Sequence, residues 1–361
     1  MSQLRTVQVL GGGSAGSSTH AGSLAAGLVA RGVRVTVCAP AALDRVHEFA
    51  ATGARFAPVP RRSDPAAVAA LRAACADADV VHAHGLHAAV RAALALSGRR
   101  TPLVVTWHTR AHAEGARRRL VHLLERRAVR AAAVVLATSS DLVDRARARG
   151  ARDARLAPVA APRTPGRAGP PAVKIRAELG AVERPLIVAL GSLVPHHGYG
   201  TLLDAAAAWR LLDPVPLVAV VGEGRERAAL RRRITAEGLP VELLGDRSDA
   251  AAVLAAADVA VLPSRWESRS TSAQQALRAG VPLVATAVGG TPELVGDAAL
   301  LVPYADAGAL AAGVARLVGD PAERDRLAAE GLRQAASWPT EDDTVAQVLA
   351  VYDELTHPLA R

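Results

Sequence analysis

Histidines follow two apolar runs of this sequence, at positions where side chains of parallel sheets meet ligands. His82 and His84 lie two apart in the run Asp79–His84, so on a strand they share one face. A metal ion would need a third or fourth ligand at defined geometry, and the sequence does not mark one. His108 follows the next apolar run, where its imidazole could hydrogen-bond a hydroxyl group or a developing charge. A loop histidine with no special role is the alternative, and no metal site is predicted.

An acidic residue precedes a predicted helix in the segment PSRWESRSTSAQQALRAG, residues 263–280. Thr271 and Gln274 match a capping box, which would start the helix just after Glu267, and the final glycine would end it. The amino end of a helix favours phosphate, so Glu267 and Gln275 are expected to face the same ligand. The alternative interpretation is that Glu267 is a solvated loop acid.

The residues Gly11–Gly16 satisfy the spacing G-x-G-x-x-G between a predicted strand and a predicted helix. Gly12 and Gly13 would let the backbone approach a phosphate or a sugar closely, and the helix N-terminus offers N–H donors. A nicotinamide cofactor would also need an acid at the end of the second strand, which instead ends in the residues 37–40, VCAP. A tight turn without a ligand is therefore the plainer interpretation.

Strand and helix patterns alternate along the chain, which predicts parallel sheets with crossover helices. Residues 157–171 are too rich in proline to join a sheet, so they are predicted to link two domains. Two such domains form a cleft, which is the expected ligand site. The predicted strands are residues 6–10, 33–39, 79–84, 102–106, 185–191, 215–222, 259–263 and 282–286. The predicted helices are residues 19–31, 200–209, 249–256, 271–279 and 341–355.

The chain is strongly basic, with a formal net charge of +9 and a pI near 10.8. Arginine supplies nearly all of the positive charge, since Lys174 is the single lysine, and only 2% of the residues are aromatic. Because platforms for nucleic-acid bases need aromatic side chains, nucleic-acid binding is not predicted. Cys38 and Cys75 are interpreted as small core residues of a protein in a reducing compartment. No stretch of the sequence is long and apolar enough to span a bilayer. A cytoplasmic protein is expected.

Residues 117–127, RRRLVHLLERR, carry apolar and basic side chains at helical spacing. One interpretation is a helix that lies on an anionic membrane, which would suit a lipid-linked substrate. The other is a basic, solvated face above an ordinary core stripe, which the abundance of arginine favours.

These motifs together resemble the retaining family-4 glycosyltransferases, including phosphatidylinositol mannosyltransferase-like members, over nearly the whole chain. The glycine loop at Gly12 and Gly13 with His20 looks like the opening of that family's acceptor domain, and the two histidine segments look like its next signatures. Ser337, Trp338 and the final helix look like the family's crossover back to the first domain. The segments that resemble the family's donor domain are 191–193 with 197–198, 222–224, 257–259, 267–280 and 288–295.

The resemblance implies an α/β fold of two Rossmann-like parallel-sheet domains that face each other across a cleft, the glycosyltransferase B-type architecture. Residues 1–160 would form the acceptor-side domain and residues 161–172 the linker. Residues 173–338 would bind the nucleotide sugar, and residues 339–361 would cross back as a helix.

The resemblance also implies transfer of a sugar from a UDP-sugar or GDP-sugar to an acceptor hydroxyl with retention, with no cofactor and no obligatory metal ion. By resemblance, His108 lies at the reacting sugar and Glu267 contacts the donor sugar. The residues expected to bind the donor are Gly191, Ser192, His197, Gly222, Arg265, Arg269, Gln275, Gly289 and Gly290.

Three positions depart from the family pattern, which usually has Arg at Ser192, Lys at His197 and a second Glu at Gln275. Loss of two cations that face a diphosphate removes charge-assisted bonds worth about 1.5–3 kcal/mol each. We therefore hypothesise that Arg269 or Arg265, together with His197 as a protonatable side chain, takes over the phosphate contacts.

The acceptor that fits the resemblance is lipid-linked or a small molecule, and peripheral contact with the inner face of a membrane would suit a role in cell-envelope glycan synthesis. The three departures favour an alternative, a degenerate member that binds a sugar nucleotide or a partner without turnover. A less favoured alternative is an NAD(P)-dependent oxidoreductase that uses the glycine loop.

Overall fold

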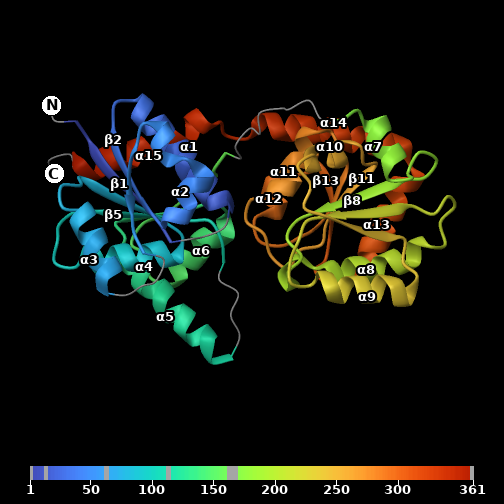
Figure 1. The fold of residues 1–361 in the computed structure, drawn as a ribbon, viewed down its shortest axis with the longest axis horizontal. Coiled ribbons are helices and arrows are strands. Elements are labelled where there is room, and N and C mark those ends of the chain that lie inside the picture. The colour runs from blue at the N-terminus through green and yellow to red at the C-terminus, as the bar shows by residue number, and fades with distance from the viewer. Residues whose placement is uncertain (1–2, 12–14, 61–64, 111–114, 161–169, 358–361) are drawn as a thin grey trace. The chain divides into compact units, whose positions relative to one another are not determined.

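The protein folds into two compact units, each a parallel sheet with helices on its faces (Figure 1). The first unit joins Met1–Pro162 to Pro339–Arg361, and the second is Arg163–Trp338. No helix that the structure describes is long and apolar enough to cross a membrane. This computed structural model describes residues 3–11, 15–60, 65–110, 115–160 and 170–357.

A parallel sheet forms the centre of the first unit. Its strands are β1 (Arg5–Leu10), β2 (Arg34–Ala39), β3 (Arg55–Pro58), β4 (Val80–His84), β5 (Leu103–Trp107), β6 (Val134–Ala137) and β7 (Ala154–Leu156). They lie in the order β3-β2-β1-β4-β5-β6-β7, so β1 and β4 are neighbours although β2 and β3 separate them in sequence. Ligands of open α/β sheets bind outside the carboxyl ends of the strands where this order reverses. In the first unit that place follows Leu10 and His84, which are paired in register.

The helices of the first unit are α1 (Ala15–Ala30), α2 (Ala41–His47), the 3₁₀ turn η1 (Phe49–Thr52), α3 (Pro65–Ala74), α4 (Leu86–Ala95), α5 (Gly115–Ala131), α6 (Ser140–Ala148) and α15 (Glu341–Thr356). The last of these starts with a capping box, in which Thr340 Oγ1 accepts the N–H of Asp343 at 3.1 Å. Its apolar face, which includes Val345 and Tyr352, is buried in the same core as Leu24 of α1. The C-terminal helix therefore completes the core of the first unit.

A second parallel sheet forms the centre of the second unit. Its strands are β8 (Leu186–Leu190), β9 (Leu217–Val221), β10 (Val241–Gly245), β11 (Val259–Leu262), β12 (Leu283–Thr286) and β13 (Ala299–Val302). They lie in the order β10-β9-β8-β11-β12-β13, so the order reverses between β8 and β11. The carboxyl ends of these two strands are therefore the expected ligand site of the second unit.

Helices cover both faces of the second sheet, because its strands are apolar on both sides. Ile187 and Val188 alternate between two buried clusters, one on each face. The helices are α7 (Ala172–Glu178), the 3₁₀ turn η2 (Pro195–His197), α8 (Tyr199–Trp209), α9 (Arg227–Glu237), α10 (Ala250–Ala255), α11 (Thr271–Arg278), α12 (Thr291–Val295), α13 (Ala307–Gly319) and α14 (Pro321–Ser337).

The strands and helices predicted from the sequence are present close to their predicted bounds, and the prediction of α/β architecture is confirmed. The capping box predicted at Thr271 and Gln274 is wrong by one residue. Ser270 is the N-cap of α11, and its Oγ accepts the N–H of Ala273 at 3.5 Å. Ser270 is five-per-cent exposed and Thr271 is exposed, so the buried hydroxyl is the one that caps the helix.

Candidate active site

A cavity of about 310 Å³ opens in the second unit at the carboxyl ends of β8 and β11. This is the place where the strand order reverses, as expected for a ligand site in an open α/β sheet. Four of the predicted donor-binding residues and the predicted catalytic Glu267 line it, and the loops after the two strands and the first turns of α11 carry them. They are Gly191, Ser192, His197, Glu267 and Gln275.

Glu267 is the only acidic side chain among the described residues that line the cavity. Burial raises the pKa of its carboxyl, while a hydrogen bond from Ser264 and the nearby His197 act in the opposite direction. The Ser264 Oγ donates to Glu267 Oε1 at 2.8 Å. Glu267 is therefore a partly buried carboxyl that Ser264 fixes by a hydrogen bond, and not the solvated loop acid of the alternative interpretation.

Two glycines position the loop that carries Glu267. The N–H of Gly290 donates to the carbonyl oxygen of Glu267 at 2.9 Å. Gly289 has a φ of +54°, and a Cβ built there would lie 2.0 Å from the same oxygen. Gly289 and Gly290 were predicted to contact the donor, but in this structure they lie outside the lining of the cavity and support Glu267 instead.

His197 also lines the cavity, and its Nδ1 is 2.7 Å from the carbonyl oxygen of Ser192. A carbonyl oxygen only accepts, so Nδ1 carries a proton and Nε2 is the nitrogen left for a ligand. Tyr199 OH donates to the carbonyl oxygen of Gly191 at 2.9 Å, and a Cβ at Gly191 would lie 3.2 Å from both His197 and Tyr199. The lack of a side chain at Gly191 therefore leaves room for these rings.

The two arginines of the hypothesis lie elsewhere. The Arg269 guanidinium lies over the Trp338 ring, 6.0 Å from its centroid, and burial lowers the pKa of Arg269 to about 10. Arg265 is exposed, and its N–H donates to the carbonyl oxygen of His196 at 2.8 Å. Neither side chain lines the cavity. Phosphate contact by Arg269 or Arg265 stays a prediction that requires these side chains to move.

Gly222 also lies outside the cavity lining. Its N–H donates to the carbonyl oxygen of Gly245 at 2.9 Å, and a Cβ at Gly222 would lie 2.1 Å from the carbonyl oxygen of Gly191. Gly222 thus allows β8 and β9 to end side by side, and its predicted donor contact is untested. Among the described residues that line the cavity, none is an arginine or a lysine.

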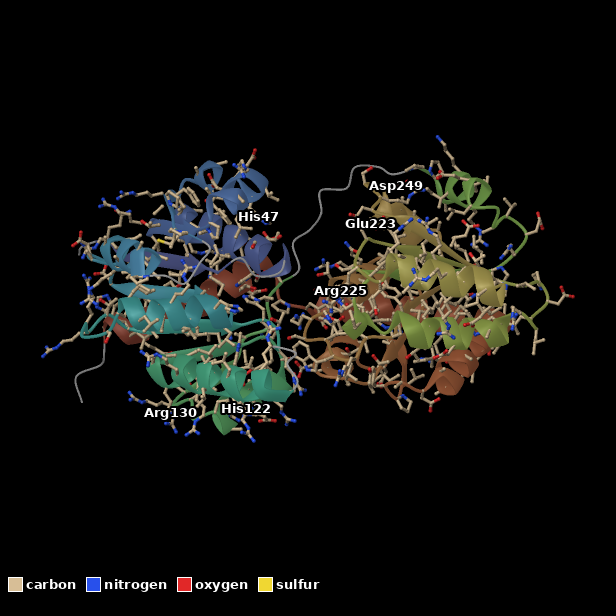
Figure 2. The ribbon with its side chains drawn as sticks, turned by 60° about the horizontal axis from the view of Figure 1, so that its bottom comes forward. His47, His122, Arg130, Glu223, Arg225 and Asp249 are labelled. Carbon is tan, nitrogen blue, oxygen red and sulfur yellow. The ribbon has the colours of Figure 1, made fainter. Side chains whose placement is uncertain are left out.

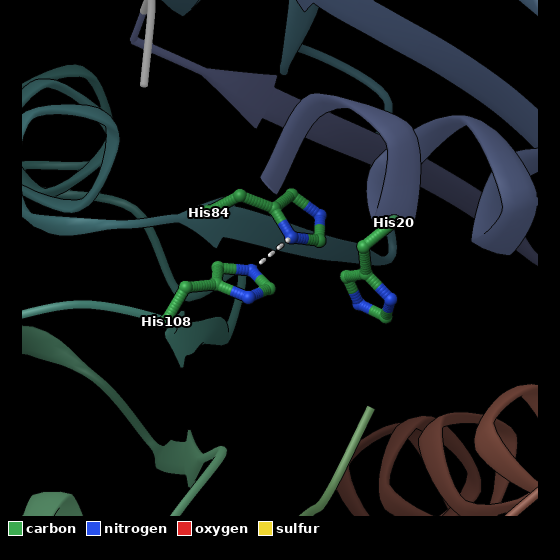
Figure 3. A group of neighbouring side chains, drawn as sticks. All are labelled: His20, His84 and His108. Atoms are coloured by element: carbon green, nitrogen blue, oxygen red, sulfur yellow. Dashed lines mark hydrogen bonds between the residues drawn. The ribbon is translucent and has the colours of Figure 1, made fainter. Parts of the chain in front are cut away.

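In the first unit, three histidines meet where the strand order reverses (Figure 3). His20 comes from α1, His84 ends β4, and His108 follows β5. His108 Nε2 is 3.5 Å from His84 Nδ1, and the ring centroids of His20 and His108 are 5.1 Å apart. The structure therefore brings together two residues that the resemblance singled out, His20 and His108. Gly12 and Gly13 lie outside the described residues.

A buried chain of polar side chains lies beneath these histidines. His84 Nε2 is 3.0 Å from Gln8 Oε1, and the Gln8 amide donates to Tyr352 OH at 3.0 Å. His82 is held at both ring nitrogens, by Tyr352 OH at 2.7 Å and by Thr106 Oγ1 at 2.6 Å. Sequence reasoning missed Gln8 and Tyr352, and a polar residue inside the apolar first strand was the available signal.

Burial lowers the pKa of all four histidines. The pKa of His20 falls to about 4 and that of His82 to about 3. The pKa values of His84 and His108 lie well below the ordinary value, through burial first and then through repulsion between neighbouring rings. These imidazoles are therefore neutral at physiological pH, and they act on a ligand through hydrogen bonds and not through charge.

The chain matches the family Glycosyl transferases group 1 over residues 173–334 and the family Glycosyl transferase 4-like domain over residues 15–162. A D-inositol 3-phosphate glycosyltransferase of Jonesia denitrificans is 30% identical over 305 residues, which cover 76% of this chain and 71% of that protein. The chain belongs to the family-4 glycosyltransferases. The chain is also 31% identical over 178 residues to a GDP-mannose-dependent monoacylated α-(1-6)-phosphatidylinositol monomannoside mannosyltransferase of Corynebacterium glutamicum.

The match with the Corynebacterium protein covers 46% of this chain and 47% of that relative, so the chain spans about half of the relative's length. Among solved structures, Anabaena HepE in complex with UDP is similar over 98% of this chain and 100% of its own, with a TM-score of 0.83 and 20% identity. The chain therefore shares the fold of HepE.

Proposed function

We propose that this glycosyltransferase transfers a hexosyl group from a UDP-sugar or GDP-sugar to an acceptor hydroxyl, with retention and without an obligatory metal ion or cofactor. The observation that carries this proposal is the cavity at the ends of β8 and β11, into which Glu267, His197 and Gln275 all project. Support comes from the family membership and from the relatives, whose names include a GDP-mannose-dependent enzyme.

The proposed reaction breaks the bond between the anomeric carbon and the leaving phosphate oxygen and forms a bond to the acceptor oxygen on the same face. The acceptor proton passes to the departing phosphate oxygen, so no further reactant is required. Glu267 would bind hydroxyls of the donor sugar, and Gln275 would bind the ribose. His108 would hydrogen-bond the reacting sugar with a neutral imidazole, because burial keeps the pKa of that ring low.

The contact between His197 and the diphosphate would involve a proton. Nδ1 is already committed to the Ser192 carbonyl oxygen, so neutral His197 presents a lone pair at Nε2. Only the doubly protonated ring can donate from Nε2 to a phosphate oxygen. The proposed phosphate contact therefore requires both ring nitrogens of His197 to carry a proton.

A panel of UDP- and GDP-sugars tests the proposal in two steps, thermal shift for binding and nucleotide release for turnover. We expect one base to stabilise the protein and one sugar to support release, and we expect Glu267→Gln to abolish release. If no nucleotide sugar binds, the proposal is wrong.

A second candidate function is binding of a sugar nucleotide without turnover. It is favoured by the lack of arginine and lysine among the described residues that line the cavity. The same panel separates the two candidates, because a non-catalytic member would show a thermal shift without release of nucleotide on addition of any acceptor.

We also propose that α5 contacts the inner face of a membrane, as a cytoplasmic enzyme of cell-envelope glycan synthesis would require. Leu120 and Leu123 are 55% and 63% exposed, and Arg126, Arg127 and Arg130 are exposed on the same helix. Figure 2 shows His122 and Arg130 on this helix. An exposed apolar stripe with flanking arginines fits contact with an anionic lipid surface better than it fits exposure to water alone.

A lipid-linked acceptor would fit this placement, and the Corynebacterium relative is named for a phosphatidylinositol monomannoside. Co-sedimentation with vesicles that contain anionic lipid tests the contact. We expect Leu120→Ser with Leu123→Ser to weaken sedimentation, while Leu211→Ser, at an exposed leucine of the second unit, should not. Equal sedimentation of the wild type, the double variant and the Leu211→Ser control would contradict the membrane contact.

A further inference from the structure

The histidine cluster of the first unit, defined as His20, His84 and His108, has the geometry of a metal site. Each residue offers one ring nitrogen, and the three nitrogens lie within 4.8 Å of one another. Figure 3 shows His20 beside His84 and His108, whose rings are joined by a dashed line. They come from a helix and from two neighbouring strand ends, so three separate elements hold them.

The distances fit a transition metal ion. A tetrahedral Zn²⁺ site with Zn–N bonds of 2.0–2.1 Å places its nitrogens about 3.3 Å apart. His84 Nδ1 and His108 Nε2 are already 3.5 Å apart, and the proton that His108 Nε2 donates to His84 Nδ1 moves to His108 Nδ1 when an ion takes its place. The His20 nitrogen, within 4.8 Å of the others, has to approach by about 1.5 Å or less, which a side-chain rotation can supply. Three imidazoles and no carboxylate select Zn²⁺, Ni²⁺ or Cu²⁺ over Mg²⁺ or Ca²⁺.

A second set of contacts orients one of the ligands. His84 Nε2 donates to Gln8 Oε1 at 3.0 Å, and Gln8 is fixed because its own amide donates to Tyr352 OH. The proton of neutral His84 therefore lies on Nε2, and the lone pair of Nδ1 faces the cluster. Metal-binding histidines commonly donate their other N–H to a carbonyl oxygen in this way.

The fourth histidine nearby, His82, is excluded from the site. Both of its ring nitrogens are used, one by Tyr352 and the other by Thr106. His82 stacks on His84 with ring centroids 4.5 Å apart, so it supports that ring from behind. Three ligands then leave a fourth tetrahedral position open. His108 is the only partly exposed member of the cluster, so its side gives an ion access.

We propose that His20, His84 and His108 form a three-imidazole site for a divalent transition-metal ion of the Zn²⁺ class, with its fourth position open to a small ligand. A bound ion occupies the His108 ring, which the proposed function assigns to the reacting sugar, so the ring can no longer turn to bind that sugar. The ion is therefore an inhibitor of transfer, and this second part of the proposal rests on the proposed function.

Binding is tested directly on the full chain without a polyhistidine tag, by calorimetric titration with Zn²⁺ and by the visible spectrum of added Co²⁺. We expect about one equivalent of Zn²⁺ and intense bands of tetrahedral Co²⁺. His20→Ala and His108→Ala should each raise the Kd at least about tenfold, and Gln8→Leu should raise it about 10- to 100-fold. His122→Ala, which removes a histidine of α5 outside the cluster, should leave the Kd unchanged.

Thermal melts in chelator show whether each variant is folded, and His20→Ala keeps every contact of the Gln8 chain. Absence of stoichiometric Zn²⁺ binding overturns the proposal, and so does a Kd that neither His20→Ala nor His108→Ala changes. If Zn²⁺ binds but the protein has no transferase activity to inhibit, the site stands and the proposed function fails. If Zn²⁺ binds and transfer continues at full rate, inhibition is refuted.

Discussion

Addition of positive charge to the cavity of the second unit should tighten the binding of nucleoside diphosphates. Among the described residues that line this cavity there is one carboxyl, Glu267, and neither an arginine nor a lysine. Ser192 is exposed at the cavity wall, next to His197. Ser192→Arg is the cleaner perturbation, because the hydrogen bond that Ser192 makes to His197 uses its backbone carbonyl oxygen and survives the substitution.

The magnitude follows from the charges at the cavity. Two unit charges about 4 Å apart near a protein surface interact by about 4 kcal/mol. Desolvation and ordering of the arginine leave a net gain of about 1.5–3 kcal/mol for one charge-assisted bond. Since about 1.4 kcal/mol corresponds to a tenfold change in Kd, the UDP or GDP affinity should rise about 10- to 100-fold. We expect the lower part of this range, because Glu267 already offers the arginine a competing carboxyl.

Isothermal titration of UDP, GDP, uridine and guanosine into wild type and Ser192→Arg measures the effect. The diphosphates should gain affinity and the nucleosides should not, because only the diphosphates carry the charge. Ala228→Arg is the matched control, since it adds the same charge at an exposed position of α9. If Ser192→Arg leaves both diphosphate affinities unchanged, or strengthens nucleoside binding equally, the phosphates do not lie near Ser192 and the reasoning is refuted.

Three further predictions concern stability. Burial raises the pKa of the Glu267 carboxyl above its ordinary 4.5, so the contribution of this group to stability is lost as pH rises through the folded-state pKa. Glu267→Gln should therefore raise the Tm more at pH 8 than at pH 4. Equal shifts of the Tm at the two pH values would contradict this. Gly289→Ala should lower stability by about 2 kcal/mol and weaken nucleotide binding, because its Cβ meets the Glu267 carbonyl oxygen, whereas Gly319→Ala has open space and should do neither. Glu125→Ala should cost about 3 kcal/mol in urea denaturation, because this 1%-exposed carboxylate binds Arg145 and Arg149, while the exposed Asp144→Ala should cost about 0.5 kcal/mol or less.

The sequence predicts the central strands well, because a strand buried on both faces is a short run of β-branched residues. Val259–Leu262 and Leu283–Thr286 are examples, each bounded by turn residues. The strands that it misses are mostly short or at sheet edges, such as Ala154–Leu156 and Arg55–Pro58. Both strands consist mostly of exposed and half-buried residues, so their pattern does not differ from that of a loop.

The sequence predicts those site residues that lie together within one short segment of the chain. Glu267 and Gln275 lie on one loop and one helix turn, so the spacing alone places them together. Arg269 shows the limit, because its packing partner Trp338 lies far along the chain and no local pattern reveals that contact. Likewise, the meeting of His84 with His108 depends on the pairing of β4 with β5, which the sequence does not specify.

The first unit is assembled from the two ends of the chain, and this has a consequence for biosynthesis. Until the ribosome has released Val345 and Tyr352, Leu24 and its neighbours on α1 lack their partners, and Gln8 lacks the hydroxyl that holds it. The second unit, in contrast, is continuous and can mature during translation. We expect the amino-terminal 160 residues, expressed alone, to aggregate and a peptide of residues 339–357 to rescue their solubility when supplied in trans.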